Sequence, residues 1–346
     1  MTEVYKVNPL RPSKAVLRRA AEVIKKGGLV AFPTETVYGL GADALNPEAV
    51  GKIFSSKERP PDNPLIVHVA DKSKVYDLAG KVPEEATVLM KAFFPGPLTI
   101  ILEKKPTVPD VTTGYLPTVA IRMPDHIVAL ALIEKAGTPI AAPSANKAGR
   151  PSPTKAEHVL EDLYGEVDLV IDGGPTKFGL ESTVIDLTVD PPQILRPGAM
   201  TVETLRGVLR EVCFHPAVLK RVGDEELFAK SPGMKYRHYA PKADLIVIVG
   251  KDRDVQSRIN DLIRDLNAKR LKAGVAVTTG KKYKAHHTEE LGESKEDIAK
   301  SLFSALRRFD KAGVNVILAE GIDEEGLGLA IMNRLKKASG YRVLMA

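Results

Sequence analysis

Two short clusters of basic and small polar residues have side chains suited to holding an anionic ligand such as a nucleotide. Lys57 and Arg59 come just before a proline-rich loop, and Ser144 and Asn146 lie in a second one. Each loop adjoins a short apolar run that predicts a buried strand. Lysine supplies a point charge, arginine supplies a planar group with several donors, and the small polar side chains form short hydrogen bonds. This combination favours a triphosphate or an adenylate as the ligand.

Each cluster also has a structural interpretation. Cations at Lys57 and Arg59 suit the end of a helix, where they complement its dipole. Ser144 and Asn146 are common turn formers after a strand. From these residues alone, both readings stay open.

The common nucleotide and hydrolase motifs are absent from the sequence. The segment 274–282 resembles a Walker loop, but its glycines are one residue too far apart and Lys282 stands where Ser or Thr is needed. No G-x-G-x-x-G follows the expected strand 245–249, and no G-x-S-x-G elbow occurs. A nucleotide would therefore be held by other loops.

Composition indicates an ordinary globular protein of two domains, with 346 residues, 44% hydrophobic and 27% charged. A single cysteine, Cys213, excludes an internal disulfide and favours a cytoplasmic location. The net charge of +6 permits contact with nucleic acid without requiring it. The histidines do not fall at metal-ligand spacing, so we expect no metal site, and His286 and His287 are interpreted as a solvated loop.

The first part of the chain predicts a twisted mixed sheet with flanking helices. We expect helices over 14–26, 47–56, 127–136, 155–163 and 202–209, and strands over 29–32, 98–102, 119–123, 169–172, 183–187 and 193–196. Residues 33–41 are interpreted as a loop whose glycines let the backbone approach a ligand closely.

The second part alternates strand and helix, which is typical of a small parallel-sheet α/β domain. Expected strands are 245–249, 275–277 and 314–319, with helices at 255–268, 298–312 and 327–338. The predicted division is a first domain over 1–212, a linker over 213–243 and a Rossmann-like domain over 244–346. The linker carries Tyr236, Arg237, His238 and Tyr239 between prolines. It is interpreted as covering a site, although a merely surface-packed linker also fits.

Several motifs in order along residues 9–208 resemble the YrdC-like threonylcarbamoyl-AMP synthases, and the rest resembles the longer two-domain members. The motifs are PTETVYGL (33–40), KERP (57–60), PLIVH (64–68), PGPLT (95–99), RMP (122–124), APSAN (142–146), ESTVID (181–186) and RPG (196–198). The resemblance implies a YrdC-like domain followed by the smaller α/β domain.

The activity implied by this resemblance is that of a nucleotidyltransferase. It makes L-threonylcarbamoyladenylate from L-threonine, bicarbonate or CO2, and ATP, and releases pyrophosphate. Mg²⁺ is expected to accompany ATP, held mostly by phosphates and water. The product would pass to a transferase that modifies the tRNA adenosine next to the anticodon, with direct tRNA contact left open. The role of the second domain is not indicated.

Site residues follow from the matching motif positions. Lys57 and Arg59 are expected to neutralise phosphate charge as the catalytic residues. The resemblance assigns ATP contacts to both and to Asn63, Thr118, Ser144, Asn146, Ser152, Arg196 and Tyr236. It assigns threonine contacts to Thr36, His68, Arg122, Ala142 and Ser182, with Arg122 suited to the carboxylate.

Two other functions remain as alternatives. A basic YrdC-like groove would also serve as an RNA-binding module, although the common RNA-binding signatures are absent. A carbamoyl phosphate-dependent adenylate enzyme, as in hydrogenase maturation proteins, would need zinc-finger and acylphosphatase-like regions that nothing in the sequence resembles. Dependence of the reaction on an amino acid separates the latter from a threonine enzyme.

Overall fold

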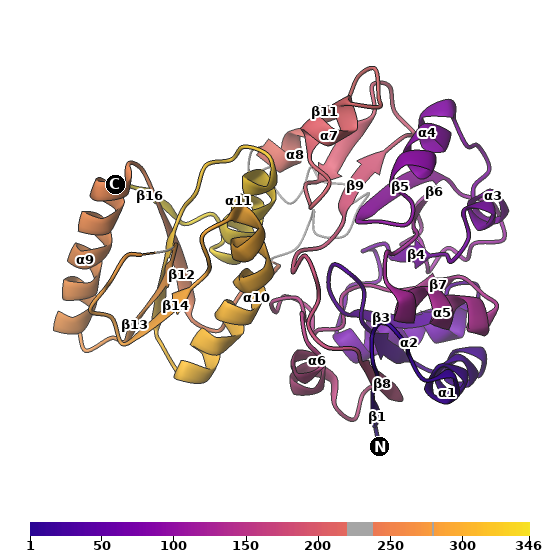
Figure 1. Cartoon of the computed structure of the whole chain (residues 1–346), viewed down its shortest axis with the longest axis horizontal. Coiled ribbons are helices and arrows are strands. Elements are labelled where there is room, and N and C mark those ends of the chain that lie inside the picture. The colour runs from indigo at the N-terminus through magenta and orange to yellow at the C-terminus, as the bar shows by residue number, and fades with distance from the viewer. Residues whose placement is uncertain (220–237, 279) are drawn as a thin grey trace. The chain divides into compact units, whose positions relative to one another are not determined.

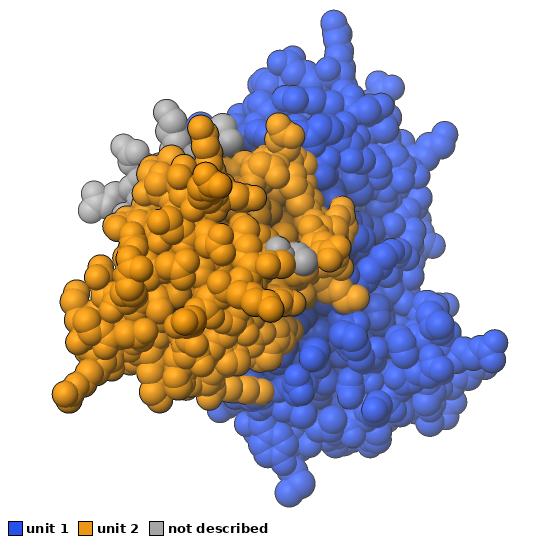
Figure 2. All heavy atoms as spheres, turned by 60° about the vertical axis from the view of Figure 1, so that its left-hand side comes forward, with its two compact units in different colours: residues 1–148, 152–236 blue, residues 149–151, 237–346 orange. Residues whose placement is uncertain are grey.

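The computed structural model describes residues 1–219, 238–278 and 280–346. Tyr236 and Arg237 lie outside the described residues. The chain divides into two compact units, which Figure 2 colours separately. The first unit comprises residues 1–148 and 152–236, and the second comprises residues 149–151 and 237–346.

The strands of the first unit are β1 (Glu3–Lys6), β2 (Val30–Phe32), β3 (Gly39–Asp43), β4 (Ile66–His68), β5 (Leu98–Glu103), β6 (Thr118–Arg122), β7 (Ile140–Ala141), β8 (Leu169–Asp172), β9 (Thr183–Asp186), β10 (Gln193–Arg196) and β11 (Cys213–Phe214). Among the described residues they form an eleven-stranded sheet in the order β1-β8-β2-β3-β7-β4-β6-β5-β9-β10-β11. Parallel and antiparallel pairs alternate irregularly along it, as in the β4–β6 and β4–β7 pairs. The predicted mixed sheet is confirmed.

Helices cover this sheet (Figure 1). They are α1 (Lys14–Lys25), α2 (Pro47–Lys57), α3 (Val75–Leu78), α4 (Glu84–Phe93), α5 (Ile127–Ala136), α6 (Ala156–Leu163), α7 (Val202–Arg206) and α8 (Pro216–Leu219), with a 3-10 turn at Lys72–Lys74. Local sequence defines both ends of α2. Asn46 caps its first turn by accepting hydrogen bonds from Glu48 N and Ala49 N, and Glu58 ends it in the left-handed conformation at φ 54°. Lys57 is therefore fixed on the last turn.

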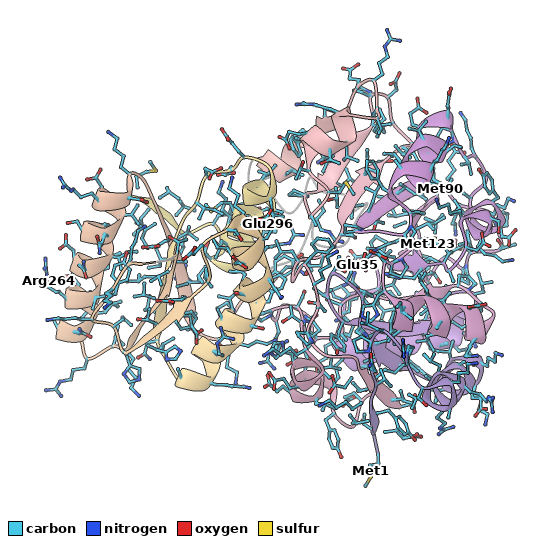
Figure 3. The ribbon with its side chains drawn as sticks, viewed as in Figure 1. Met1, Glu35, Met90, Met123, Arg264 and Glu296 are labelled. Atoms are coloured by element: carbon cyan, nitrogen blue, oxygen red, sulfur yellow. The ribbon has the colours of Figure 1, made fainter. Side chains whose placement is uncertain are left out.

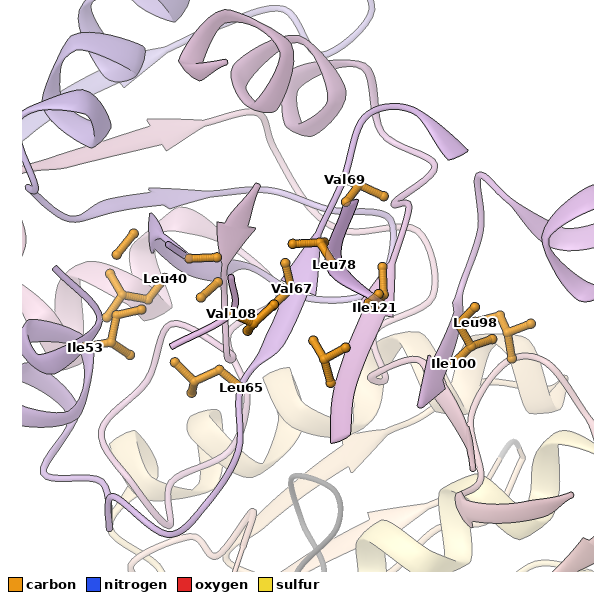
Figure 4. Packing of buried hydrophobic residues seen from close by; sticks show 14 of the residues in the cluster. Leu40, Ile53, Leu65, Val67, Val69, Leu78, Leu98, Ile100, Val108 and Ile121 are labelled. Atoms are coloured by element: carbon orange, nitrogen blue, oxygen red, sulfur yellow. The ribbon is translucent and has the colours of Figure 1, made fainter. Parts of the chain in front are cut away.

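The main core of the first unit lies on one face of the sheet (Figure 4). Leu65 and Val67 of the β4 region and Ile121 of β6 point into it together with Ile53 of α2. Because side chains alternate along a strand, the residues between them point to the opposite face. That opposite face of β4 and β6 holds the site described below.

The second unit is a five-stranded parallel sheet, counted over the described residues, in the order β14-β13-β15-β12-β16. Figure 1 shows α9 on one face of this sheet and α10 and α11 on the other. The predicted parallel α/β architecture is confirmed. The elements are β12 (Asp244–Val249), α9 (Asp252–Ala268), β13 (Ala273–Val277), β14 (His287–Glu290), α10 (Lys295–Ala312), β15 (Val316–Glu320), α11 (Leu327–Ala338) and β16 (Val343–Met345).

Two segments expected to be loops are strands. Residues 39–41, the end of the expected loop 33–41, pair with β2 as part of β3, and this pairing needs glycine, because a Cβ on Gly41 would lie 2.7 Å from both Phe32 and Ile140. His287 begins β14 instead of lying in a solvated loop, and its ring packs edge-on against Phe309 at 5.5 Å. Across the described ranges, no helix has the length and apolar character needed to cross a membrane.

Candidate active site

A small apolar cluster on the sheet face opposite the main core forms the floor of the candidate site. It consists of Ile66, Ile101, Ala120, Val184 and Leu195, contributed by β4, β5, β6, β9 and β10. Ile66 and Ala120 are register partners in the parallel β4–β6 pair. We call this cluster the apolar floor.

Polar side chains lie on the same face at the two ends of β4 and β6. His68 and Arg122 are register partners at the carboxyl ends, two residues beyond Ile66 and Ala120. Thr118 begins β6 at the other end, four residues before Arg122. At a strand rise of about 3.3 Å per residue, Thr118 and Arg122 are about 13 Å apart. The floor therefore separates two polar ends.

Lys57 and the Ser144–Asn146 segment meet at the amino end of β4. The Lys57 ammonium, buried at 1% exposure, donates to Ser144 O at 2.5 Å and also to Asn146 O. In return, Ala148 N donates to Lys57 O at 2.8 Å. The antiparallel β4–β7 pair explains this meeting, because it brings the loop before β4 to the loop after β7. Lys57 thus also positions the second cluster.

Arg59 folds back over the proline-rich loop that it begins. Its Nε donates to Asn63 O at 3.2 Å, and its Nη2 donates to Pro64 O at 3.0 Å. Asn63 is buried, and its Oδ1 accepts no hydrogen bond from any described residue. The loop that follows Lys57 in the chain therefore carries a cation and a buried amide.

The loop 33–38 covers the other polar end, where Arg122 lies. Glu35 forms a buried ion pair with Arg122, with Oε1 and Nη2 2.7 Å apart. Thr36 is fully buried, and its hydroxyl lies 2.9 Å from the Thr34 hydroxyl. Phe178 N and Gly179 N donate to the carbonyls of Glu35 and Thr36. These bonds hold the loop in one conformation.

Ser182 connects the residues assigned to threonine with those assigned to ATP. Its hydroxyl lies 2.7 Å from Thr99 Oγ1 and accepts from Arg196 Nη2 at 3.1 Å. Arg196 Nε also donates to Ser182 O at 3.0 Å. Further along the same segment, Glu181 accepts from the Ser152 hydroxyl at 2.5 Å. Arg196 is thereby aimed at the face that carries the apolar floor.

His68 is neutral in the folded protein. Burial, and to a smaller extent the positive charge of the Arg122 guanidinium, lower the pKa of His68 to about 3. The ring Nδ1 lies 3.1 Å from Ile66 O. His68 therefore offers a hydrogen-bonding ring without adding charge beside Arg122.

This pKa of His68 predicts a pH dependence of stability. The unfolded chain binds a proton at His68 near pH 6.5, whereas the folded chain binds it only near pH 3. The stabilisation is complete above pH 6.5 and is lost as the pH falls towards 3. From pH 7 to pH 5 the wild type should lose about 2 kcal/mol more free energy of unfolding than His68→Gln. Urea unfolding of both proteins at the two pH values measures this difference, and equal losses would contradict the neutral state.

The structure brings most of the predicted site residues to one face of the sheet and its bordering loops. Ala142 N donates to Ile66 O, so Ala142 borders the apolar floor. Tyr236 lies outside the described residues, and its assignment stays a prediction. Residues not singled out from the sequence are Glu35, Thr99 and Glu181. Each lies in one of the family motifs found in the sequence, and that position could have drawn attention to it. Only the fold shows which residue each of them contacts.

Comparisons with known proteins identify the family of this chain. A family model described as telomere recombination matches residues 22–198, and one described as threonylcarbamoyl-AMP synthase, C-terminal domain, matches residues 200–340. Threonylcarbamoyl-AMP synthase from Pyrococcus abyssi is 54% identical over 328 residues, covering 95% of both chains. The Bacillus subtilis protein of the same name is 49% identical, covering 95% of this chain and 94% of its own.

A solved structure of similar fold is the crystal structure of Pyrococcus abyssi Sua5 complexed with L-threonine. It matches with a TM-score of 0.96 at 52% identity and covers 100% of both chains. The two family models together extend over both units described above, and the matching relatives span nearly the whole chain. This chain therefore belongs to the threonylcarbamoyl-AMP synthase family, in its two-domain form.

Proposed function

We propose that this protein synthesises L-threonylcarbamoyladenylate from L-threonine, bicarbonate or CO2, and ATP, with release of pyrophosphate. The observation that carries the proposal is the pair of polar ends on one apolar floor. Lys57 and Arg59 lie towards one end and Arg122 at the other, about 13 Å along the strand from Thr118. Relatives named for this activity at 54% and 49% identity support it.

Threonine is proposed to occupy the end at Arg122. The guanidinium suits the amino acid's carboxylate, because a planar fork binds a carboxylate with two hydrogen bonds. Thr36, neutral His68 and Ser182 surround it with groups that accept or donate hydrogen bonds to a hydroxyl. The P. abyssi structure with bound L-threonine supports this choice of amino acid.

ATP is proposed to lie towards Lys57, with its phosphates near Arg59 and Arg196. In the reaction, a carbamate oxygen of N-carboxythreonine attacks the α-phosphorus, and the bond from that phosphorus to the β-phosphate bridging oxygen breaks. The substrates supply both the nucleophile and the leaving group. The protein's contribution is to orient them and to neutralise charge that develops on the phosphates.

Magnesium is proposed to enter with ATP as part of the substrate. Mg²⁺ commonly keeps several waters and is held by substrate phosphates with few protein ligands. The adenylate would then pass to a transferase acting on tRNA. Whether this chain itself contacts tRNA is a separate proposal that its basic charge of +6 permits.

Pyrophosphate release, with each co-substrate omitted in turn, tests the proposal. With ATP and magnesium present, release should require both L-threonine and bicarbonate. Release that ignores threonine would point to another acyl-adenylate reaction. Absence of release, together with RNA binding that weakens steeply with salt, would favour the RNA-binding alternative.

A further inference from the structure

The carboxylate of Glu35 is buried in the first unit, and the described residues leave both of its oxygens without a hydrogen-bond donor. Its residue is 2% exposed, and Figure 3 labels it inside this unit. Neither Oε1 nor Oε2 accepts a hydrogen bond from any described residue. Its contact is the 2.7 Å approach of Arg122 Nη2 to Oε1, in which the guanidinium N–H bonds are poorly aligned.

Burying a carboxylate without donors costs free energy unless a ligand supplies the missing hydrogen bonds. Buried carboxylate oxygens normally accept hydrogen bonds, and a buried ion pair is stable only when its remaining polar atoms are satisfied. Nearby His126 does not neutralise the charge, because burial keeps the pKa of His126 below its ordinary value despite the attraction of Glu35. The part of the chain that the structure describes therefore supplies neither a donor to Glu35 nor a hydrogen-bond acceptor to Arg122 Nη2.

The loop holds Glu35 in this position by bonds that do not involve its carboxylate. Thr34 Oγ1 donates to Val37 O at 2.6 Å, and Phe178 N donates to Glu35 O at 2.9 Å. The side chain is consequently presented to Arg122 by a fixed backbone. A carboxylate that is held in place and lacks donors is suited to receive a ligand's donors.

We propose that Glu35 binds the α-ammonium group of the amino acid substrate, while Arg122 binds its α-carboxylate. The ammonium brings three N–H donors to the carboxylate oxygens, and the substrate carboxylate brings acceptors to the guanidinium. A zwitterion thus replaces the misaligned ion pair with two aligned ones. This inference rests on the proposed function. It assigns to Glu35 the selection of an α-amino acid over a hydroxy acid that lacks the amino group.

Two ligands with Glu35→Gln test this role. L-Threonine carries the ammonium, whereas 3-hydroxybutanoate has the same skeleton with hydrogen in its place. By calorimetric titration, the variant should bind L-threonine about 10- to 100-fold more weakly than the wild type does. Its affinity for 3-hydroxybutanoate should be unchanged or higher. An equal loss for both ligands would mean that Glu35 only positions Arg122, and it would overturn the inference, as would unchanged binding of threonine.

Asp186→Asn is the matched control, since Asp186 is also a buried carboxylate of the first unit. Its Oδ1 accepts from Thr188 N and Thr188 Oγ1 at 2.9 and 2.6 Å, so this carboxylate, unlike that of Glu35, already has donors. Its substitution should leave threonine affinity unchanged.

A crystal structure of the wild type with threonine gives a second readout, independent of how the variants fold. The ammonium nitrogen should lie within about 3.2 Å of a Glu35 oxygen, and a longer distance overturns the inference alone. Failure of the wild type to bind threonine would contradict the proposed function itself, and this inference with it.

Discussion

Lys57→Ala is expected to lower kcat/KM for pyrophosphate release by about 100- to 1,000-fold. The substitution removes a charge proposed to act on the phosphates, and loss of one such donor costs that much in comparable sites. It also removes the bonds to Ser144 O and Asn146 O that join the two clusters. Steady-state kinetics with ATP as the varied substrate measures the effect.

Lys52→Ala is the matched control for this prediction. Lys52 lies on the same helix, α2, and likewise donates to a backbone carbonyl, Gly27 O at 2.7 Å. Its loss should change kcat/KM by less than about threefold, because Lys52 is not among the residues proposed to bind the phosphates and its hydrogen bond to a carbonyl does not stabilise charge in the transition state. If the two variants had similar activity, the assignment of Lys57 to the phosphates would be wrong.

Arg122→Gln is expected to abolish threonine-dependent turnover and to lower the free energy of unfolding by about 3–5 kcal/mol. The stability loss follows because Glu35 stays buried at this position without its ion-pair partner. The loss of turnover follows because the proposed partner of the threonine carboxylate is gone. Urea unfolding and pyrophosphate release measure the two effects separately.

A double substitution separates stability from function at this pair. Glu35→Gln with Arg122→Gln removes both charges, so most of the lost stability should return while activity stays absent. Arg19→Gln serves as the control, because the Arg19–Glu3 pair lies at the surface and its loss should leave unfolding unchanged within error. An Arg122→Gln protein as stable as the wild type would contradict the buried ion pair.

The elements with strong periodicity and clear end signals could be predicted from the sequence. The helix at 127–136 and the three strands expected in the second unit, observed as β12, β13 and β15, have clear apolar patterns and lie close to where they were expected. The short β1 and the glycine-containing β3 could not be predicted in this way. Both become strands because neighbouring strands pair with them, as β8 pairs with β1. This pairing joins residues far apart in the chain, so the local sequence does not reveal it.

The sequence allowed us to predict which residues belong to the candidate site, but not which of them contact one another. The sequence indicated that Lys57 and Ser144 suit a nucleotide, yet only the β4–β7 pairing shows that Lys57 holds Ser144 directly. Glu35 stands in a motif beside Thr36, where a glutamate has many ordinary roles. The role proposed for Glu35 depends on Arg122, which lies 87 positions further along the chain. Only the fold shows that Arg122 Nη2 lies 2.7 Å from Glu35 Oε1.

The central claim is that carbon from bicarbonate joins threonine to AMP on this protein. Incubation with ATP, magnesium, L-threonine and ¹³C-bicarbonate, followed at once by mass spectrometry, tests it most directly. We predict an adenylate whose mass contains threonine, AMP and one labelled carbon, and we predict that Lys57→Ala forms far less of it in the same time. An adenylate lacking threonine or the labelled carbon, or its complete absence with the wild type, would contradict the account.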